Sequence, residues 1–302
     1  MSYGQTATAM EEVLNAAGIF TRPGTVRYVH SGLGTNGSNY GSEPEQPYAS
    51  IDYAIGRCNV PAAANGHGDT IVVLPGHTEA LSAAASIAVD VAGITIIGKG
   101  NGRNRPVLTW GTAITASMTV TGANTKFQNI VFDFTGFDAI TAAIVVNAAD
   151  VSFDNCEFIT NSGTIGVVSG ITVGGTTTSP RFTVTNSRFI GPATNSGTTT
   201  TAQVTITDAP DFVFENNYCT GKMTQSINNA ATNLRGLIRN NAFVVATGTK
   251  AINMAAASTP FITNNRINVP SGTAPIVAAA GFVSGNNYSA AAGVTAGTAS
   301  TI

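Results

Sequence analysis

Carboxylate side chains gather in two stretches of the chain, and they are the side chains best suited to catalysis or metal binding. A polysaccharide lyase needs several carboxylates that hold Ca²⁺ beside a lysine or arginine acting as a base. A glycoside hydrolase needs two carboxyl groups that flank the bond to be broken. The candidates are Asp133, Asp138, Asp150, Asp154, Glu157, Asp208, Asp211 and Glu215.

The sequence around these carboxylates favours structural roles over catalysis. Asp150, Asp208 and Asp211 fall in or beside turn sequences, where aspartate is common because its side chain bonds the local backbone. The chain has no Asp-Asp doublet, and the string GHG (66–68) precedes the repeats described below. We therefore predict that the chain has no catalytic residue.

Histidine and cysteine offer the other routes to a metal site. His30, His67 and His77 all lie in the first third of the chain, so a metal trio is conceivable, although loop and surface histidines are far commoner. The cysteines have no CxxC or CxxH spacing, which argues against zinc; they are Cys58, Cys156 and Cys219. We expect no metal, no cofactor and free thiols typical of a reducing cytosol.

Two further features have both a binding interpretation and a structural one. Trp110 is the only tryptophan; it could stack on a sugar, but we expect it to pack over an early repeat. The string GKGNGRNR (98–105) looks like a phosphate loop, yet it lacks the GK[ST] ending and a following helix. We predict an exposed basic turn there.

Composition limits the classes of partner. The chain has 302 residues, a net charge of −2 and only 10% charged residues, so we expect no nucleic-acid binding. The charge is uneven: residues 1–215 hold 9 basic and 16 acidic groups, whereas residues 216–302 hold 5 basic groups and no acidic group. The N-terminus lacks the pattern of a secretory signal, and no apolar run reaches the length of a membrane span.

A repeated motif runs through most of the chain. Each copy has an apolar residue, then an asparagine two positions later, and usually another apolar residue three positions after that, as in Phe153, Asn155 and Phe158. The copies are 22 to 31 residues apart, and the pattern fades in the last one. The asparagines are Asn129, Asn155, Asn186, Asn216, Asn240, Asn264 and Asn286.

These repeats predict an all-β coil of parallel strands with about eight turns. A second alternating strand precedes each motif by about ten residues, as in 143–149 and 203–209, and the copy near 226–232 is weak. A unit of this size with short strands and no helix cannot bury its own apolar face, but it can do so when stacked on copies of itself. The alternative, a sandwich, requires frequent hairpin turns, which are scarce here.

The asparagines mark the place where the chain turns between two strands. Asparagine tolerates left-handed backbone angles, and stacked asparagine side chains can bond from one turn of the coil to the next. We predict that the seven asparagines form a structural ladder. The second residue of each doublet forms a parallel column, which reads Ile130, Cys156, Ser187, Asn217, Asn241, Asn265 and Asn287. The same alignment predicts outer ion pairs between neighbouring turns, Glu157 with Arg188 and Glu215 with Arg239.

The repeats and the segment before them resemble the right-handed parallel β-helix (pectin-lyase-like) family. The resemblance rests on PYASIDYAI, which would form a helix that caps the open end of the coil, and on GDTIVVLPG, which resembles a first turn; these strings lie in 28–55 and 68–80. The family includes polysaccharide lyases, hydrolases and non-catalytic virion proteins, so the resemblance implies the fold more firmly than the function.

The chain divides into four segments on this interpretation. Residues 1–27 are an N-terminal arm, 28–68 a leading loop with the capping helix, 69–290 the coil, and 291–302 a C-terminal tail. Thr8 and Glu11 form a capping-box pattern at the start of a short amphipathic helix. The arm is either a second cap on the coil or an anchor on a partner subunit; its candidate contact residues are Met10, Val13, Leu14, Ile19, Phe20 and Arg22.

The leading functional hypothesis is a non-enzymatic structural protein of a bacteriophage virion, assembled in the host cytoplasm. Within that class we favour a capsid decoration (cement) protein that binds the major capsid protein or another virion protein through its arm. The resemblance implies a homotrimer. The alternatives are a phage tail fibre or tailspike that binds host glycans, and a polysaccharide lyase or hydrolase.

Overall fold

The computed structural model describes most of the coil and its N-terminal cap. The described residues are 24–58, 68–111, 113–160, 166–191, 200–230, 235–246, 250–254, 259–268, 276–278, 283–285 and 287–289. Within them no helix is long and apolar enough to cross a membrane.

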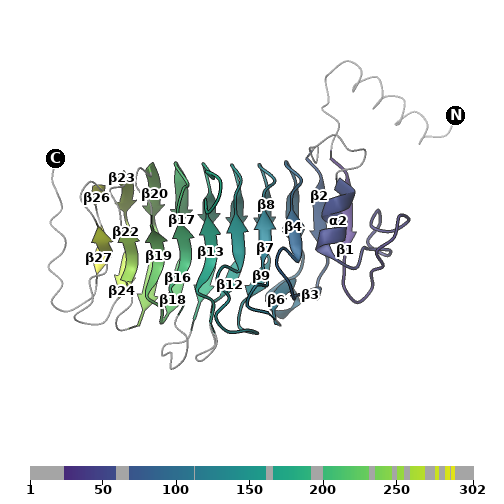
Figure 1. The fold of residues 1–302 in the computed structure, drawn as a ribbon, viewed down its shortest axis with the longest axis horizontal. Helices are drawn as coiled ribbons and strands as arrows, with labels where there is room; N and C mark the ends of the chain where they lie inside the picture. The colour runs from purple at the N-terminus through teal and green to yellow at the C-terminus, as the bar shows by residue number, and fades with distance from the viewer. Residues whose placement is uncertain are drawn as a thin grey trace, which may run out of the picture.

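The chain forms a right-handed parallel β-helix in which three sheets run the length of a rod (Figure 1). Every strand pair described is parallel, as the repeats predict. The shortest sheet has 8 strands, so the described part of the coil has eight turns with all three strands, in agreement with the prediction. We call the sheets the first, second and third in the order in which the chain enters them.

The first sheet is the longest and begins ahead of the predicted first turn. Its extra strand, β1, pairs with β2 and extends the sheet over the leading loop. The strands are β1 (Val26–Val29), β2 (Thr70–Val73), β5 (Thr95–Gly98), β8 (Lys126–Gln128), β11 (Ser152–Asp154), β14 (Thr183–Thr185), β17 (Phe212–Glu215), β20 (Arg235–Arg239), β23 (Thr259–Thr263) and β26 (Val283–Gly285).

The second and third sheets complete each turn. The second contains β3 (Thr78–Leu81), β6 (Val107–Trp110), β9 (Val131–Asp133), β12 (Glu157–Ile159), β15 (Arg188–Ile190), β18 (Tyr218–Gly221), β21 (Ala242–Val245), β24 (Arg266–Asn268) and β27 (Tyr288–Ser289). The third contains β4 (Ile87–Val89), β7 (Met118–Val120), β10 (Ile144–Val146), β13 (Ser169–Val173), β16 (Ala202–Ile206), β19 (Gln225–Asn229), β22 (Lys250–Met254) and β25 (Ile276–Ala278). The weak copy near 226–232 is therefore a true strand, β19.

Stacked aromatic rings fill the bore of the coil. The ring of Phe158 is parallel to those of Phe132 and Phe189, with centroid distances of 5.0 and 4.5 Å. Trp110 is 0% exposed and meets Phe134 edge-on at 4.7 Å. This confirms that Trp110 packs on an early turn, and its burial rules out stacking on a sugar.

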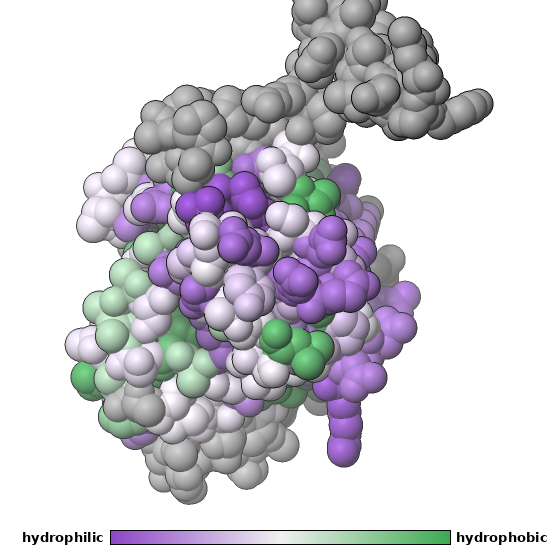
Figure 2. Space-filling view, turned by 90° about the vertical axis from the view of Figure 1, so that its right-hand side faces the viewer, coloured by the Kyte–Doolittle hydropathy of each residue, from purple (hydrophilic) through white to green (hydrophobic). Residues whose placement is uncertain are grey.

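A short helix closes the N-terminal end of the bore. Helix α2 (Ile51–Cys58) buries Ile51, Ala54, Ile55 and Cys58, and the Ser50 hydroxyl accepts a long hydrogen bond of 3.4 Å from the Tyr53 amide. A carboxylate oxygen of Asp52 accepts the Ala88 amide at 2.9 Å, which ties the helix to β4. Figure 2 looks onto this capped end, whose described surface is largely hydrophilic with isolated hydrophobic spots. The predicted cap is thus confirmed.

Candidate functional site at the asparagine corner

The corner between the first and second sheets is built by one asparagine in each turn. Six of them have φ between 52° and 57°, the left-handed region predicted from their spacing; they are Asn129, Asn155, Asn186, Asn216, Asn240 and Asn264. Asparagine tolerates this backbone better than other residues with a Cβ. The seventh, Asn286, lies outside the described residues.

The hydrogen-bonded ladder runs through the second residue of each doublet, which corrects the predicted ladder. The Asn241 side-chain oxygen accepts the Asn217 amide at 2.8 Å, and the Asn241 side-chain nitrogen donates to the Phe214 carbonyl at 2.9 Å. Asn265 repeats this pattern on Asn241 and Ile238. These side chains point inward and are 0–2% exposed, because the residue after a left-handed corner faces the bore.

The side chains of the corner asparagines face outward, and their hydrogen-bond partners differ from one turn to the next. The Asn129 side chain donates to the carbonyls of Gly98 and Gly100, at 2.9 and 3.0 Å. The Asn155 side chain reaches Asn129 at 3.3 Å, whereas Asn186 donates to a carboxylate oxygen of Asp154 at 2.8 Å. Their shared property is therefore the left-handed backbone and not a continuous row of side-chain bonds.

One of the two predicted ion pairs is present. Arg239 bonds Glu215 at 2.8 Å across one turn. Glu157 lies beside Arg188 in the register, as predicted, but its partner is Arg105, at 3.4 Å. Arg188 instead lies over the ring of Tyr218, 5.9 Å from its centroid. The prediction of a Glu157–Arg188 pair was wrong because Glu157 instead bonds Arg105, which comes from a loop outside the repeat.

A second left-handed corner, five residues before four of the asparagines, was missed. Asn124, Asp150, Arg181 and Asp211 have φ between 55° and 61°. At this corner Arg181 pairs with Asp150, and Arg235 pairs with Asp211 at 2.8 Å. In these four turns the offset is always five residues, a regularity that can be read from the sequence.

Asp154 is a carboxylate beside the asparagine corner that accepts several side-chain hydrogen bonds. It accepts hydrogen bonds from Asn186, Thr185 and Gln128, at 2.8, 2.9 and 3.2 Å. Burial acts to raise the pKa of Asp154, but these hydrogen bonds outweigh burial, so its pKa lies below the usual value. As predicted, Thr185 separates Asp154 from Glu215 in the same column, so the two acids are two turns apart.

The remaining candidate acids lie in separate local contacts. Asp133 accepts the amide and hydroxyl of Thr135, Asp138 accepts the Gly166 amide, and Asp208 accepts the Thr178 hydroxyl. Within the part of the chain that the structure describes, no group of three or more His, Cys, Asp or Glu side chains could hold a metal ion.

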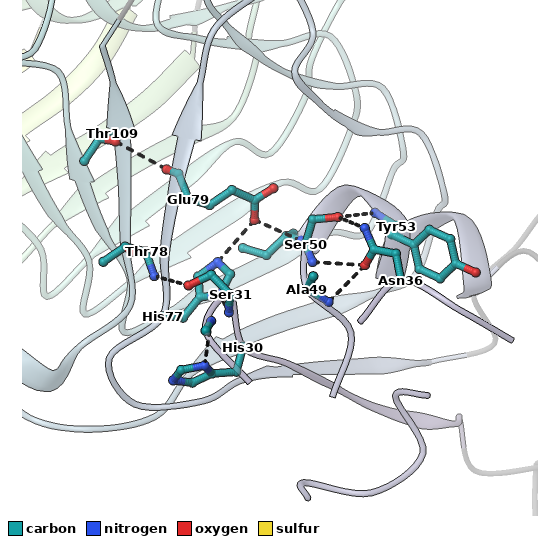
Figure 3. A network of polar contacts seen from close by, with 12 residues as sticks. His30, Ser31, Asn36, Ala49, Ser50, Tyr53, His77, Thr78, Glu79 and Thr109 are labelled. Carbon is teal, nitrogen blue, oxygen red and sulfur yellow. Dashed lines mark hydrogen bonds and ion pairs between the residues drawn. The ribbon is translucent and has the colours of Figure 1, made fainter. Parts of the chain in front are cut away.

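A polar network joins the leading loop, the capping helix and β3 (Figure 3). His77 is 0% exposed, so the expectation of a surface histidine is wrong for this residue. One ring nitrogen accepts the Ser31 amide at 2.9 Å, and the other is 3.2 Å from a carboxylate oxygen of Glu79. The same Glu79 oxygen accepts the Ile51 amide at the start of α2. These contacts dock the cap on the coil, a role that no local sequence pattern indicates.

Several predicted features are buried or lie outside the described residues. The three cysteines are free and buried, and burial raises the pKa of Cys58 and Cys156 to about 12 and that of Cys219 well above the usual value. The arm residues Met10, Val13, Leu14, Ile19, Phe20 and Arg22, together with His67, lie outside the described residues.

Two hollows lie along the asparagine corner. One has a volume of about 390 Å³ and includes Lys99, Gln128, Asn129, Asp154 and Asn155 in its lining. The other, near the C-terminal end, has a volume of about 440 Å³ and is lined by Asn240, Asn241, Ala242, Asn264 and Arg266. Each hollow is therefore a polar depression at the corner, on the outside of the rod.

Comparison with known proteins shows similarity of the backbone fold only. No protein family matches the chain, and no curated protein matches its sequence. An alginate lyase from Paenibacillus is 18% identical with a TM-score of 0.45, over 77% of this chain and 91% of the lyase. A lacto-N-biosidase from Eubacterium ramulus is 11% identical with a TM-score of 0.42, over 93% and 70%. The product of open reading frame 18 of Geobacillus virus E2 is 12% identical with a TM-score of 0.36, over 94% and 64%.

Proposed function

We propose that the chain is a non-enzymatic structural protein of a bacteriophage virion. Within the virion it acts as a capsid decoration protein, a homotrimer whose β-helix projects from the shell. Residues 1–27 anchor it on the major capsid protein or another virion protein. The comparisons have TM-scores below 0.5 and carry no weight in this proposal, which rests on the residues of the coil.

The observation that carries the non-enzymatic proposal is the way the coil uses its carboxylates. Asp150, Asp211 and Glu215 each bond an arginine of the next turn, and Glu157 bonds Arg105. These acids form contacts between turns, whereas a lyase or hydrolase needs acids that converge on a substrate.

The ionisation of these acids supports the same function. A hydrogen bond from Arg181 lowers the pKa of Asp150, and one from Arg235 lowers the pKa of Asp211. A general acid for glycoside hydrolysis requires the opposite, a carboxyl group whose pKa is raised so that it holds a proton near neutral pH. These side chains are therefore suited to permanent ion pairs.

The path of the chain supports anchoring at one end. The described chain begins at Gly24 beside Gly68, at the capped end where β1 and α2 lie (Figure 1). Residues 1–23 are joined to the coil at this end, so anchoring through them leaves the rest of the coil projecting outward. Val13 and Leu14 are apolar residues in the sequence of this segment and are the predicted contacts.

Co-sedimentation with capsids tests this proposal. The full chain is mixed with shells assembled from the major capsid protein encoded in the same genome, and bound chain is measured. We expect saturable binding, at least tenfold weaker after Leu14→Glu because the substitution replaces a predicted apolar contact residue with a charged one. Glu12→Gln, a change of charge outside the predicted contact residues, is the matched control and should bind as the unaltered chain does.

Two outcomes would contradict the proposal. Equal binding of the Leu14→Glu variant would show that the arm is not the anchor. Release of unsaturated products or new reducing ends from polysaccharides by the purified chain would show an enzyme.

A further inference from the structure

The outer face of the first sheet changes character along the rod. One outward column of this sheet is polar in three successive turns, with Lys126, Ser152 and Thr183 in register. In the next three turns, which contain β17, β20 and β23, the same column is apolar; its residues are Val213, Leu237 and Phe261. We call these three residues the apolar row. It lies towards the C-terminal end of the described coil (Figure 1).

The apolar row is open to solvent in the single chain. Phe261 is 49% exposed, and Val213 and Leu237 are partly exposed, because alternate residues of a strand face outward. Residues in register on neighbouring strands are about 4.8 Å apart, so the three side chains form one continuous strip. Apolar side chains that are scattered singly are ordinary on a protein surface, whereas contiguous ones indicate contact with another molecule.

Ion pairs flank the apolar row on both sides. Arg235 bonds Asp211 at 2.8 Å where β17 and β20 begin, and Arg239 bonds Glu215 at 2.8 Å where they end. Each of these residues stands two positions from a member of the row in its own turn. An apolar centre inside a polar rim is the usual arrangement of a protein–protein contact.

Two features favour a second copy of this chain as the partner. Each acid of the rim is bonded to an arginine of its own chain, so the rim has no net charge to repel the same surface of another copy. A rod that lies alongside also repeats its turns at the same spacing of about 4.8 Å, so the apolar residues of two copies can meet turn by turn. We propose that the apolar row is the surface through which copies of this chain associate side by side.

The number and direction of the copies rest on the proposed function, a homotrimer whose capped ends all face the shell. The rods are then parallel, equivalent turns lie at the same height, and Phe261 of each copy lies near Phe261 of its neighbours. Antiparallel rods with their apolar rows in contact around Leu237 would instead bring Phe261 near Val213. The two directions therefore differ in which residues meet.

Sedimentation equilibrium of the full chain tests the inference. We expect a mass three times the 30.7 kDa of the single chain. Phe261→Glu should raise the dissociation constant at least tenfold because it places a charge inside the apolar contact, and Leu237→Glu should do the same. Val244→Glu is the matched control and should associate as the unaltered chain does. Val244 is 42% exposed on the outside of the second sheet, where its neighbours in register are Thr220 and Asn268.

Cross-linking locates the contact independently of the glutamate variants. Phe261→Cys adds a thiol on the surface, while the chain's own cysteines are buried. A short bismaleimide should join two Phe261→Cys copies and should not join two Val244→Cys copies. An unchanged far-ultraviolet circular dichroism spectrum of each variant verifies its fold.

Several results would overturn the inference. They are a single-chain mass at every concentration, a trimer that dissociates no more readily in Phe261→Glu and Leu237→Glu, an equal loss in Val244→Glu, or cross-linking of Phe261→Cys only to a Val213→Cys copy. A single-chain mass would contradict the proposed homotrimer as well, whereas a trimer that survives both row variants would refute the apolar row alone. Capsid binding through the arm is measured separately, so it can hold when this inference fails.

Discussion

Replacement of Asn241 by alanine tests the separation between the corner and the ladder. The Asn241 side chain accepts the Asn217 amide at 2.8 Å and donates to the Phe214 carbonyl and the Asn265 side chain, both at 2.9 Å. The side chain is 1% exposed, so water cannot replace it. An orphaned buried amide costs about 1–3 kcal/mol, and each of the other two hydrogen bonds contributes about 1 kcal/mol.

The expected loss in free energy of unfolding for Asn241→Ala is therefore about 4 kcal/mol. For a chain of this size that corresponds to a fall of roughly 6 °C in the unfolding midpoint. The neighbouring corner residue, Asn240, is exposed with φ of 57°, so Asn240→Ala should cost only about 1 kcal/mol for the left-handed backbone. Asn240→Gly should be close to neutral because glycine adopts that backbone freely.

Urea unfolding followed by circular dichroism measures these differences, with thermal unfolding as a second measurement. The order of stability should be unaltered chain, Asn240→Gly, Asn240→Ala and then Asn241→Ala, with the largest gap before the last. Equal losses for the two alanine variants would refute the assignment of corner and ladder. So would an Asn241→Ala variant within about 0.5 kcal/mol of the unaltered chain, since a lost buried hydrogen-bond network must cost more than that.

Three further predictions follow from the packing and the ionisation of the coil. Because folding lowers the pKa of Asp154, its contribution to the free energy of unfolding should be complete above pH 3.8, its ordinary pKa, and should be lost as the pH falls through the folded-state pKa. Asp154→Asn should flatten this part of the profile of stability against pH, measured by urea unfolding. An unchanged slope would contradict the assignment to Asp154. Phe158→Ala should cost about 3–5 kcal/mol in urea unfolding because it removes a fully buried ring between two others, and a loss below about 1 kcal/mol would contradict the stack. Ellman's reagent should label no thiol in the folded chain and 3 thiols after unfolding, whereas rapid labelling of the folded chain would contradict burial of Cys58, Cys156 and Cys219.

The fold could be predicted because the corner between two strands needs a left-handed residue, and the sequence places an asparagine there in one turn after another. The step of three residues from Asn155 to Phe158, where a straight strand has two, marks a corner without any knowledge of the structure. The ladder was placed one residue off because both members of an Asn-Asn doublet can bond between turns. Only the left-handed φ at the first asparagine settles that the second one faces the bore.

The contacts that escaped prediction come from segments outside the repeat. Arg105 reaches Glu157 from the loop between β5 and β6, and His77 is buried by the leading loop through Ser31. The length and path of such loops vary from turn to turn, so no fixed spacing encodes their partners. The hollow at Ala242 was missed for another reason: its lining comes from two neighbouring turns, which are brought together only once the register is known.

The proposed location of the protein in a virion is tested most directly by electron cryomicroscopy. On this proposal the virions to image are those of a phage whose genome encodes the chain. We expect rods of parallel β-helix on the outer face of the capsid, grouped in threes, with the capped end and the N-terminal arm against the shell. Rods at the tail tip, or virions that contain none of this chain, would contradict it.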